Sequence, residues 1–114
     1  MITPSLAQEV SQLEANLCSA FADPTRILIL YALNDHPRNV TELSKELSAT
    51  QSTTSRHLKI LRDHGLVRTT RQGVNIIYEL TDSRLIEALD ILRSVLRDSI
   101  ALKANLIAEI ETKP

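Results

Sequence analysis

Two short helical segments separated by only three residues constrain the fold of this chain most. Residues 40–47 place a valine and two leucines on one helical face, and residues 51–64 form a second amphipathic segment. Only residues 48–50 lie between them, and Thr50 has a hydroxyl that can cap the second helix. Two short helices joined by so tight a turn predict a helix-turn-helix.

The second of these helices has two chemically different faces. Thr54, Leu58 and Leu61 fall on one side at helical spacing, and we expect them to pack against the preceding helix. The other side gathers short hydroxyls and cations, so it is polar and basic. Its members are Ser52, Ser55, Arg56 and Lys59.

Proline and capping residues mark the remaining helices. Asp23 can cap a helix that begins at Pro24, because proline lacks the donor that would go unused at that position. Residues 24–34 are apolar on nearly every side, so this helix is predicted to be central and buried. Apolar stripes predict two further helices, over residues 5–21 and 83–110.

Two glycines mark the end of the helix-turn-helix and the turn of a hairpin. Gly65 stands where a helix ending near residue 64 needs a left-handed residue, and Gly73 separates two predicted strands, 66–70 and 75–80. A two-stranded hairpin is not stable alone, so it must pack on the helices. We predict a mainly α fold with a small β-hairpin, a winged helix-turn-helix of order α-α-α-α-β-β-α. Residues 1–114 are expected to form a single domain.

The first and last helices have more apolar surface than a chain of 114 residues can cover. The last helix alone would be about 40 Å long. We therefore expect a homodimer in which these two helices form the interface. The predicted interface residues are Leu6, Val10, Leu13, Leu17, Leu85, Leu89, Leu92 and Leu96.

The single cysteine, Cys18, lies on or beside the apolar stripe of the first helix. We expect it to behave as a small buried hydrophobe. The alternative is a redox-responsive thiol that meets its symmetry mate across the dimer, but the sequence places no base nearby that would activate the thiol. One cysteine cannot build an internal disulfide framework, which favours a reducing compartment.

Positive charge is concentrated in one part of the chain. Residues 55–71 have five arginines and lysines and one acid, a local charge of +4 in a chain whose net charge is −1. Such a basic segment indicates a local contact with a polyanion, because Lys and Arg displace condensed counterions. An exposed helix of this kind fits the major groove of DNA, and a hairpin beside it reaches the backbone or the minor groove. The predicted DNA-contacting residues are Gln51, Ser52, Thr53, Ser55, Arg56, Lys59, Arg68, Arg71, Gln72 and Asn75.

Other functions are disfavoured by spacing. The chain has no G-x-S-x-G motif, and Asp63 lies too far along the helix from Ser55 to complete a triad, so we expect no enzyme. His57 and His64 are two helical turns apart, about 10 Å, which is too far to share one zinc at about 2.0 Å per ligand. We expect no metal and no cofactor. No apolar run of membrane-spanning length and no signal peptide is present, which predicts a cytoplasmic protein without membrane contact.

Three stretches together resemble the ArsR/SmtB family of bacterial winged-helix transcriptional repressors, over about residues 12–92. They are "LCSAFADPTRILILYAL", "QSTTSRHLKILRDHGLV" and "RQGVNIIYEL", and "VTELSKEL" between the first two belongs to the same resemblance. The resemblance implies a homodimeric repressor that binds a partly palindromic DNA operator and is released by an inducer. It places the recognition helix at residues 51–64 and the tip of the wing at residues 71–75.

The sequence departs from this family where the family senses its inducers. The cysteine pair of the thiolate metal site is missing from "VTELSKEL", residues 83–114 contain no histidine, and dithiol sensing lacks a second cysteine. Ser48 also replaces the glycine often found in the turn, at a cost of roughly 1 kcal/mol if it is left-handed. The inducer therefore stays unknown. The alternative function is a helical protein–protein interaction module without operator binding.

Overall fold

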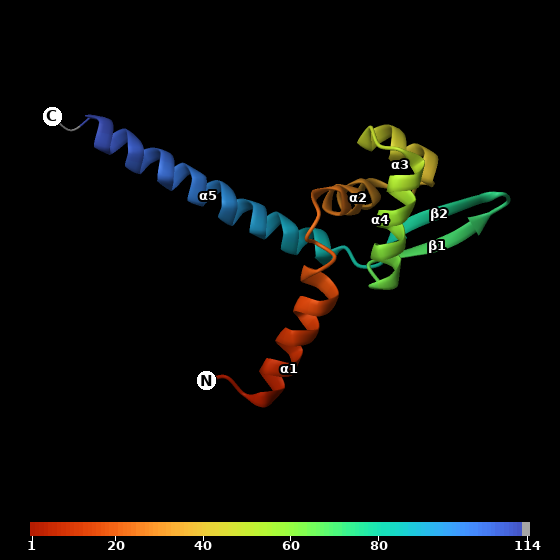
Figure 1. The fold of residues 1–114 in the computed structure, drawn as a ribbon, viewed down its shortest axis with the longest axis horizontal. Coiled ribbons are helices and arrows are strands. Elements are labelled where there is room, and N and C mark those ends of the chain that lie inside the picture. Colours follow the sequence, from red (N-terminus) through yellow and green to blue (C-terminus); the bar gives the residue numbers. More distant parts are fainter. Residues whose placement is uncertain (113–114) are drawn as a thin grey trace. The chain divides into compact units, whose positions relative to one another are not determined.

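The computed structural model describes residues 1–112 and contains the predicted order of helices and strands (Figure 1). The predicted winged helix-turn-helix, mainly α with one hairpin, is confirmed. The elements are α1 (Pro4–Leu13), a π-helical turn η1 (Glu14–Cys18), α2 (Pro24–Asp35), α3 (Val40–Leu47), α4 (Gln51–Asp63), β1 (Val67–Gln72), β2 (Asn75–Leu80) and α5 (Arg84–Thr112).

By its internal contacts the chain divides into two compact units. Residues 1–82 form the first, and α5 belongs to the second, which begins at Ser83. That residues 1–114 make a single domain stays a prediction. Within the part of the chain that is described, no helix has the length and apolar character that crossing a bilayer requires.

The first helix is shorter than predicted. It begins as expected for a capped helix, with Thr3 Oγ1 accepting a hydrogen bond of 3.1 Å from the Leu6 N–H. Its α-helical part ends at Leu13, and the Ser19 N–H then bonds back five residues to the Glu14 carbonyl at 3.0 Å, which defines the π turn. The predicted helix 5–21 is therefore wrong beyond Cys18. The chain has to leave helical geometry before Pro24, because a residue that precedes proline is disfavoured in the α region.

The core of the first unit is built around one side of α2. Ile29, Leu30 and Leu33 are buried, and α2 contacts α3, α4 and β2. Burial of each such side chain contributes about 1.5–3 kcal/mol. The expectation that α2 is buried on nearly every side is wrong, because Leu28 is 56% exposed. The elements that pack on α2 leave this part of its surface uncovered.

Local capping fixes α3 and the turn after it. Asn39 and Glu42 form a reciprocal capping box, in which each side chain accepts a hydrogen bond from the backbone N–H of the other, at 2.9 and 3.2 Å. The helix ends at Ser48, which is left-handed (φ 52°), as the missing glycine suggested. This geometry costs roughly 1 kcal/mol in a residue other than glycine, and it directs the chain into α4.

The hairpin extends from the end of α4. Gly65 (φ 74°) ends the helix, and the Leu66 N–H donates to the Leu61 carbonyl at 2.9 Å. β1 and β2 are antiparallel, and Gln72 pairs with Asn75, so Gly73 and Val74 form a two-residue tip. β1 continues to residue 72, two residues beyond the predicted strand, because the two strands stay paired as far as Gln72 and Asn75.

Candidate nucleic-acid interface

The recognition helix α4 is anchored at its first turn by hydroxyl groups. Thr50 Oγ1 accepts a hydrogen bond from the Thr53 N–H at 3.1 Å and donates to Thr53 Oγ1 at 2.9 Å. The Thr54 hydroxyl donates to the Thr50 carbonyl at 2.9 Å. Thr50 is thus the cap that the sequence predicts. The Thr53 hydroxyl is partly committed to this cap, so it has less freedom to contact a ligand than its neighbours.

The two faces of α4 are separated as predicted. Thr54, Leu58 and Leu61 have 0% of their surface exposed, and they join α4 to the core. The residues on the opposite face are exposed. They are Gln51, Ser52, Ser55, Arg56 and Lys59, and the Gln51 amide also donates to Thr41 Oγ1 of α3 at 3.4 Å. One face therefore holds the helix in place, and the other is open to a ligand.

The predicted cations fall into a paired and an unpaired group. Lys59 Nζ lies 2.9 Å from Asp63 Oδ2, and Arg68 forms an ion pair with Glu79 across the hairpin. Arg56 and Arg71 form no ion pair within residues 1–112. Exposed ion pairs are weak because water and salt screen them. A phosphate can therefore compete with Asp63 and Glu79 for the paired cations, and it meets no such competition at the other two.

The pair with Lys59 also affects Asp63. The hydrogen bond and the positive charge of Lys59 lower the pKa of this carboxyl below its ordinary value. Asp63 is therefore ionised at neutral pH and can form the ion pair with Lys59.

The wing presents its polar residues on both faces. Alternation along the strands places Arg68 and Gln72 on one face and Arg71 on the other, where it pairs in register with Ile76. Arg68 and Arg71 therefore lie on opposite faces of the hairpin, and their predicted contacts with DNA stay predictions. Gln72 and Asn75 pair with each other beside the tip.

Two exposed apolar residues near the wing tip are not among the predicted contacts. Val74 is 95% exposed and Ile76 is 46% exposed. A β-branched residue directly after Gly73 is the pattern that could have revealed the first, because both residues of a two-residue hairpin turn project away from the strands. Ile76 adds apolar surface on the face of the hairpin that also has Arg71, its partner in register.

Arg26 is a third residue that the sequence alone did not indicate. Its Nε donates to the Ala20 carbonyl at 2.7 Å and its Nη2 to the Ser19 carbonyl at 3.3 Å. Its Nη1 lies 3.3 Å from Nδ1 of His57, which is buried on α4. Arg26 therefore connects the recognition helix to the end of the first helical region. A lone arginine at the start of an apolar helix is the pattern that could have revealed it.

The end of α2 nearest to Arg26 is capped as predicted. Asp23 Oδ1 accepts a hydrogen bond of 2.7 Å from the Thr25 N–H. This backbone hydrogen bond is the main reason that the pKa of Asp23 lies below its ordinary value, and the nearby His57 and Arg26 lower it further.

The predicted dimer residues differ in exposure. Leu6, Val10 and Leu13 of α1 are 45–50% exposed, and Leu92 and Leu96 of α5 are also exposed. Leu17 and Leu85 are half-buried and Leu89 is buried. Further exposed apolar residues on α5, which the predicted stripe does not include, are Ile91, Val95, Leu102, Leu106 and Ile110. The apolar surface of α5 is therefore wider than one stripe.

The remaining candidate residues are placed as follows. Cys18 is exposed, so the expectation of a buried hydrophobe is wrong for the single chain. The reason is its position, because Cys18 is the last residue of η1 and the helix predicted over residues 5–21 does not continue past it. No group of three or more His, Cys, Asp or Glu side chains within residues 1–112 is arranged to hold a metal ion.

Known proteins match both the sequence and the fold. Residues 23–69, from the cap of α2 into β1, match the family described as "Bacterial regulatory protein, arsR family". The HTH-type transcriptional regulator NmtR of Mycobacterium tuberculosis is 37% identical over 87 residues, which cover 76% of this chain and 72% of NmtR. The HTH-type transcriptional regulator CmtR of Mycobacterium bovis is 45% identical over 75 residues, 66% of this chain and 64% of CmtR.

Among solved structures, the crystal structure of NolR from Sinorhizobium fredii is similar with a TM-score of 0.72. Its sequence is 30% identical, and the match covers 83% of this chain and 94% of NolR. The similarity therefore extends well beyond the helix-turn-helix.

Proposed function

This chain belongs to the ArsR family of bacterial regulatory proteins and is a DNA-binding transcriptional regulator, and we propose that it acts as a homodimeric repressor of a partly palindromic operator. In this proposal α4 enters the major groove and the hairpin contacts the adjacent backbone or minor groove. An inducer then releases the protein from its operator. NmtR and CmtR are named as transcriptional regulators, and we propose no catalytic role.

The observation that carries the proposal is the open polar face of α4. This face exposes Arg56 without an ion pair in the described chain, while the opposite face is fully buried. An arginine in the major groove can donate two hydrogen bonds to a guanine edge. We assign Ser52, Ser55 and Arg56 to base edges or adjacent phosphates, with Gln51 and Thr53 beside them at the start of the helix.

The cations outside this group are proposed to contact phosphates. Lys59 and Arg68 would exchange their carboxylate partners, Asp63 and Glu79, for phosphate oxygens. Arg71 and the neighbouring Gln72 and Asn75 lie at the wing tip, where a hairpin reaches the DNA backbone. Such contacts position the protein without reading sequence.

A dimer follows from the exposed apolar residues of α1 and α5. Each of these helices by itself exposes several leucine, isoleucine or valine side chains, which is unfavourable in water and indicates a protein partner. With two-fold symmetry the same surface on a second copy covers it, and two α4 helices are presented to two half-sites. A regulator of this kind acts at the chromosome, so we propose a cytoplasmic location.

The proposal is tested with DNA from upstream of the protein's own gene. Footprinting should reveal a protected, partly palindromic segment, and fluorescence anisotropy should measure binding to that segment and to a scrambled duplex of equal length. We expect about 10³-fold or greater preference for the protected sequence and a steep loss of affinity with added salt. Equal affinity for both duplexes would contradict operator recognition, and binding that ignores salt would favour the interaction-module alternative.

A further inference from the structure

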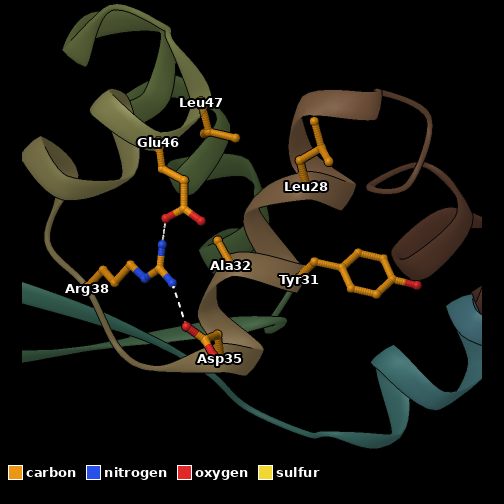
Figure 2. Close-up of a pocket in the computed structure, with 7 residues that line it drawn as sticks. All are labelled: Leu28, Tyr31, Ala32, Asp35, Arg38, Glu46 and Leu47. Atoms are coloured by element: carbon orange, nitrogen blue, oxygen red, sulfur yellow. Dashed lines mark hydrogen bonds and ion pairs between the residues drawn. The ribbon is translucent and has the colours of Figure 1, made fainter.

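A cavity of about 440 Å³ lies between α2 and α3, on residues to which the proposed DNA contact assigns no role (Figure 2). All of its lining belongs to the first unit, residues 1–82. Its size falls within the range of sites that bind small organic molecules, about 300–1,000 Å³. Such sites combine apolar walls with a few polar groups, and this cavity has both.

One end of the cavity is charged. The Arg38 guanidinium lies between two carboxylates, with Nη2 2.9 Å from Asp35 Oδ2 and Nη1 paired with Glu46 (Figure 2). Arg38 is only 6% exposed, while the Asp35 and Glu46 side chains are 71% and 50% exposed. The formal charges of Asp35, Glu46 and Arg38 sum to −1, and Asp35 Oδ2 also lies 2.8 Å from Nδ1 of the neighbouring His36.

The rest of the cavity is apolar. Leu28 and Ala32 of α2 and Leu47 of α3 line it, and the Tyr31 ring lies at the end away from Arg38 (Figure 2). Leu28 is the exposed residue that contradicts the prediction of a buried α2. An exposed leucine beside a cavity is a ready contact for an apolar ligand.

We propose that this cavity binds a small amphipathic organic cation, with its hydrocarbon or aryl body against Leu28, Ala32 and Leu47 and its cationic group beside the carboxylates of Asp35 and Glu46. An organic anion is disfavoured because Arg38 already has two carboxylate partners and the net charge at this end is negative. A neutral molecule gains only the apolar contact.

Binding at this place would act on the helix-turn-helix. The Arg38–Glu46 pair connects the segment after α2 to α3, and α3 contacts α4 through packing and through the Thr41–Gln51 hydrogen bond. Arg38 Nε is buried and has no hydrogen-bond partner within the described chain, so the guanidinium depends strongly on its two carboxylates. A cation that competes for those carboxylates weakens this connection and favours a different placement of α3.

The cation is thereby an inducer, a conclusion that rests on the proposed operator binding. Thermodynamic linkage requires that a ligand which lowers DNA affinity binds more tightly to the DNA-free protein, by the same factor.

Three probes with one aryl ring test the site on the full chain without DNA. They are benzylamine, which is a cation at neutral pH, phenylacetate, which is an anion, and benzyl alcohol, which is neutral. Backbone amide shifts in two-dimensional NMR should saturate with benzylamine around Leu28, Ala32 and Leu47. We expect benzylamine to bind at least about tenfold more tightly than either other probe. Equal binding by all three, or shifts that do not saturate, would overturn the proposal.

Variants separate the charge from the apolar wall. Glu46→Gln should weaken benzylamine about tenfold and leave benzyl alcohol unchanged, whereas Glu109→Gln, at an exposed position of α5, should change neither. Leu28→Ala should weaken all three probes, and because Leu28 is 56% exposed, this variant keeps the buried core of the first unit intact. Unchanged benzylamine affinity in Glu46→Gln would refute the assignment of the cationic group.

A DNA competition then tests regulation separately. Benzylamine should release the protected duplex from the wild-type protein and fail to do so in Glu46→Gln. If the protein binds benzylamine but never binds operator DNA, the proposed function is refuted and the assignment of the cavity as a cation-binding site is retained. If it binds both independently, the regulatory role of the cavity is refuted.

Discussion

Helices α1 and α4 are both amphipathic, yet the chain treats them in opposite ways. α4 has its apolar face fully buried in its own unit and exposes a polar, cationic face. α1 has no buried residue at all, and its Leu6, Val10 and Leu13 lie on the surface. The comparison teaches that an amphipathic pattern fixes which side of a helix needs cover, but not whether the same chain or another supplies it.

The difference assigns the two helices to different partners. The polar face of α4 suits a hydrated polyanion, because its charges stay exposed to solvent while the opposite face alone holds the helix in place. An apolar face left open suits another protein surface. Four variants test this contrast, in order of decreasing effect.

The largest effect is expected from a charge in the α1 stripe. Leu13→Glu should weaken the dimer by about 3–6 kcal/mol, because burial of a leucine contributes about 1.5–3 kcal/mol and a two-fold interface loses it twice. Sedimentation equilibrium measures the change. Gln8→Glu adds the same charge on the opposite side of α1 and should leave the dimer intact. A fully dimeric Leu13→Glu protein would show that α1 is not covered by a partner.

The next effect concerns the open face of α4. Arg56→Ala should reduce affinity for the protected duplex by about 1–3 kcal/mol and relax specificity at one base pair, if Arg56 donates to a guanine. Fluorescence anisotropy on the wild-type operator and on single-base variants measures both. Arg97→Ala removes an exposed arginine from α5 and serves as the control. An equal loss on scrambled DNA would make Arg56 a backbone contact instead.

A smaller effect is expected at the cap of α4. Thr50→Ala removes the acceptor for the Thr53 N–H and should lower the free energy of unfolding by about 1 kcal/mol in urea denaturation. Ser52→Ala, two residues further along, should change stability by less than about 0.5 kcal/mol, because the Ser52 side chain makes no hydrogen bond within residues 1–112. Equal loss in both variants would mean that the cap contributes little to α4.

The smallest effect is expected at the paired cation of α4. Lys59→Ala should lower the slope of log affinity against log salt by about one unit, because one phosphate contact is lost. Asp63→Asn removes the competing carboxylate, so it should raise DNA affinity slightly with the slope retained. An unchanged slope in Lys59→Ala would place this lysine outside the contact with DNA.

The pH dependence of this pair has a defined sign. The pKa of Asp63 is lowered in the folded chain, so its contribution to stability is present above the ordinary pKa of an aspartate and is lost as the pH falls through the lowered value. Lys59 is then released. We expect the difference in DNA affinity between wild type and Asp63→Asn to disappear at that acidic end, which a titration by anisotropy would measure.

The elements of the fold could be predicted because their determinants are local. Asp23 and Thr50 cap helices within a few residues of themselves, and Gly65 and Gly73 adopt the positive φ that their turns require. The face of α4 that is buried also followed from spacing alone. Each of these features depends only on residues that lie within a few positions of one another along the chain.

Other features depend on residues that are distant in sequence. The contact between Arg26 and His57 spans 31 positions, and the ion pair of Arg68 with Glu79 spans 11 and requires the hairpin register. The exposure of Leu28 and the cavity beside Arg38 depend on how α3 packs on α2. None of these follows from a helical or strand period.

The amino-acid order by itself determined where this chain turns, which helices it forms and which segment has the positive charge, since caps, prolines, glycines and periodicity act over a few residues. Only the tertiary structure decided which cations are free, how far the first helix keeps α geometry and where a leucine stays uncovered beside a cavity. The physical reason is that ion pairing and burial depend on which surfaces meet in space, and those surfaces come from segments far apart along the chain.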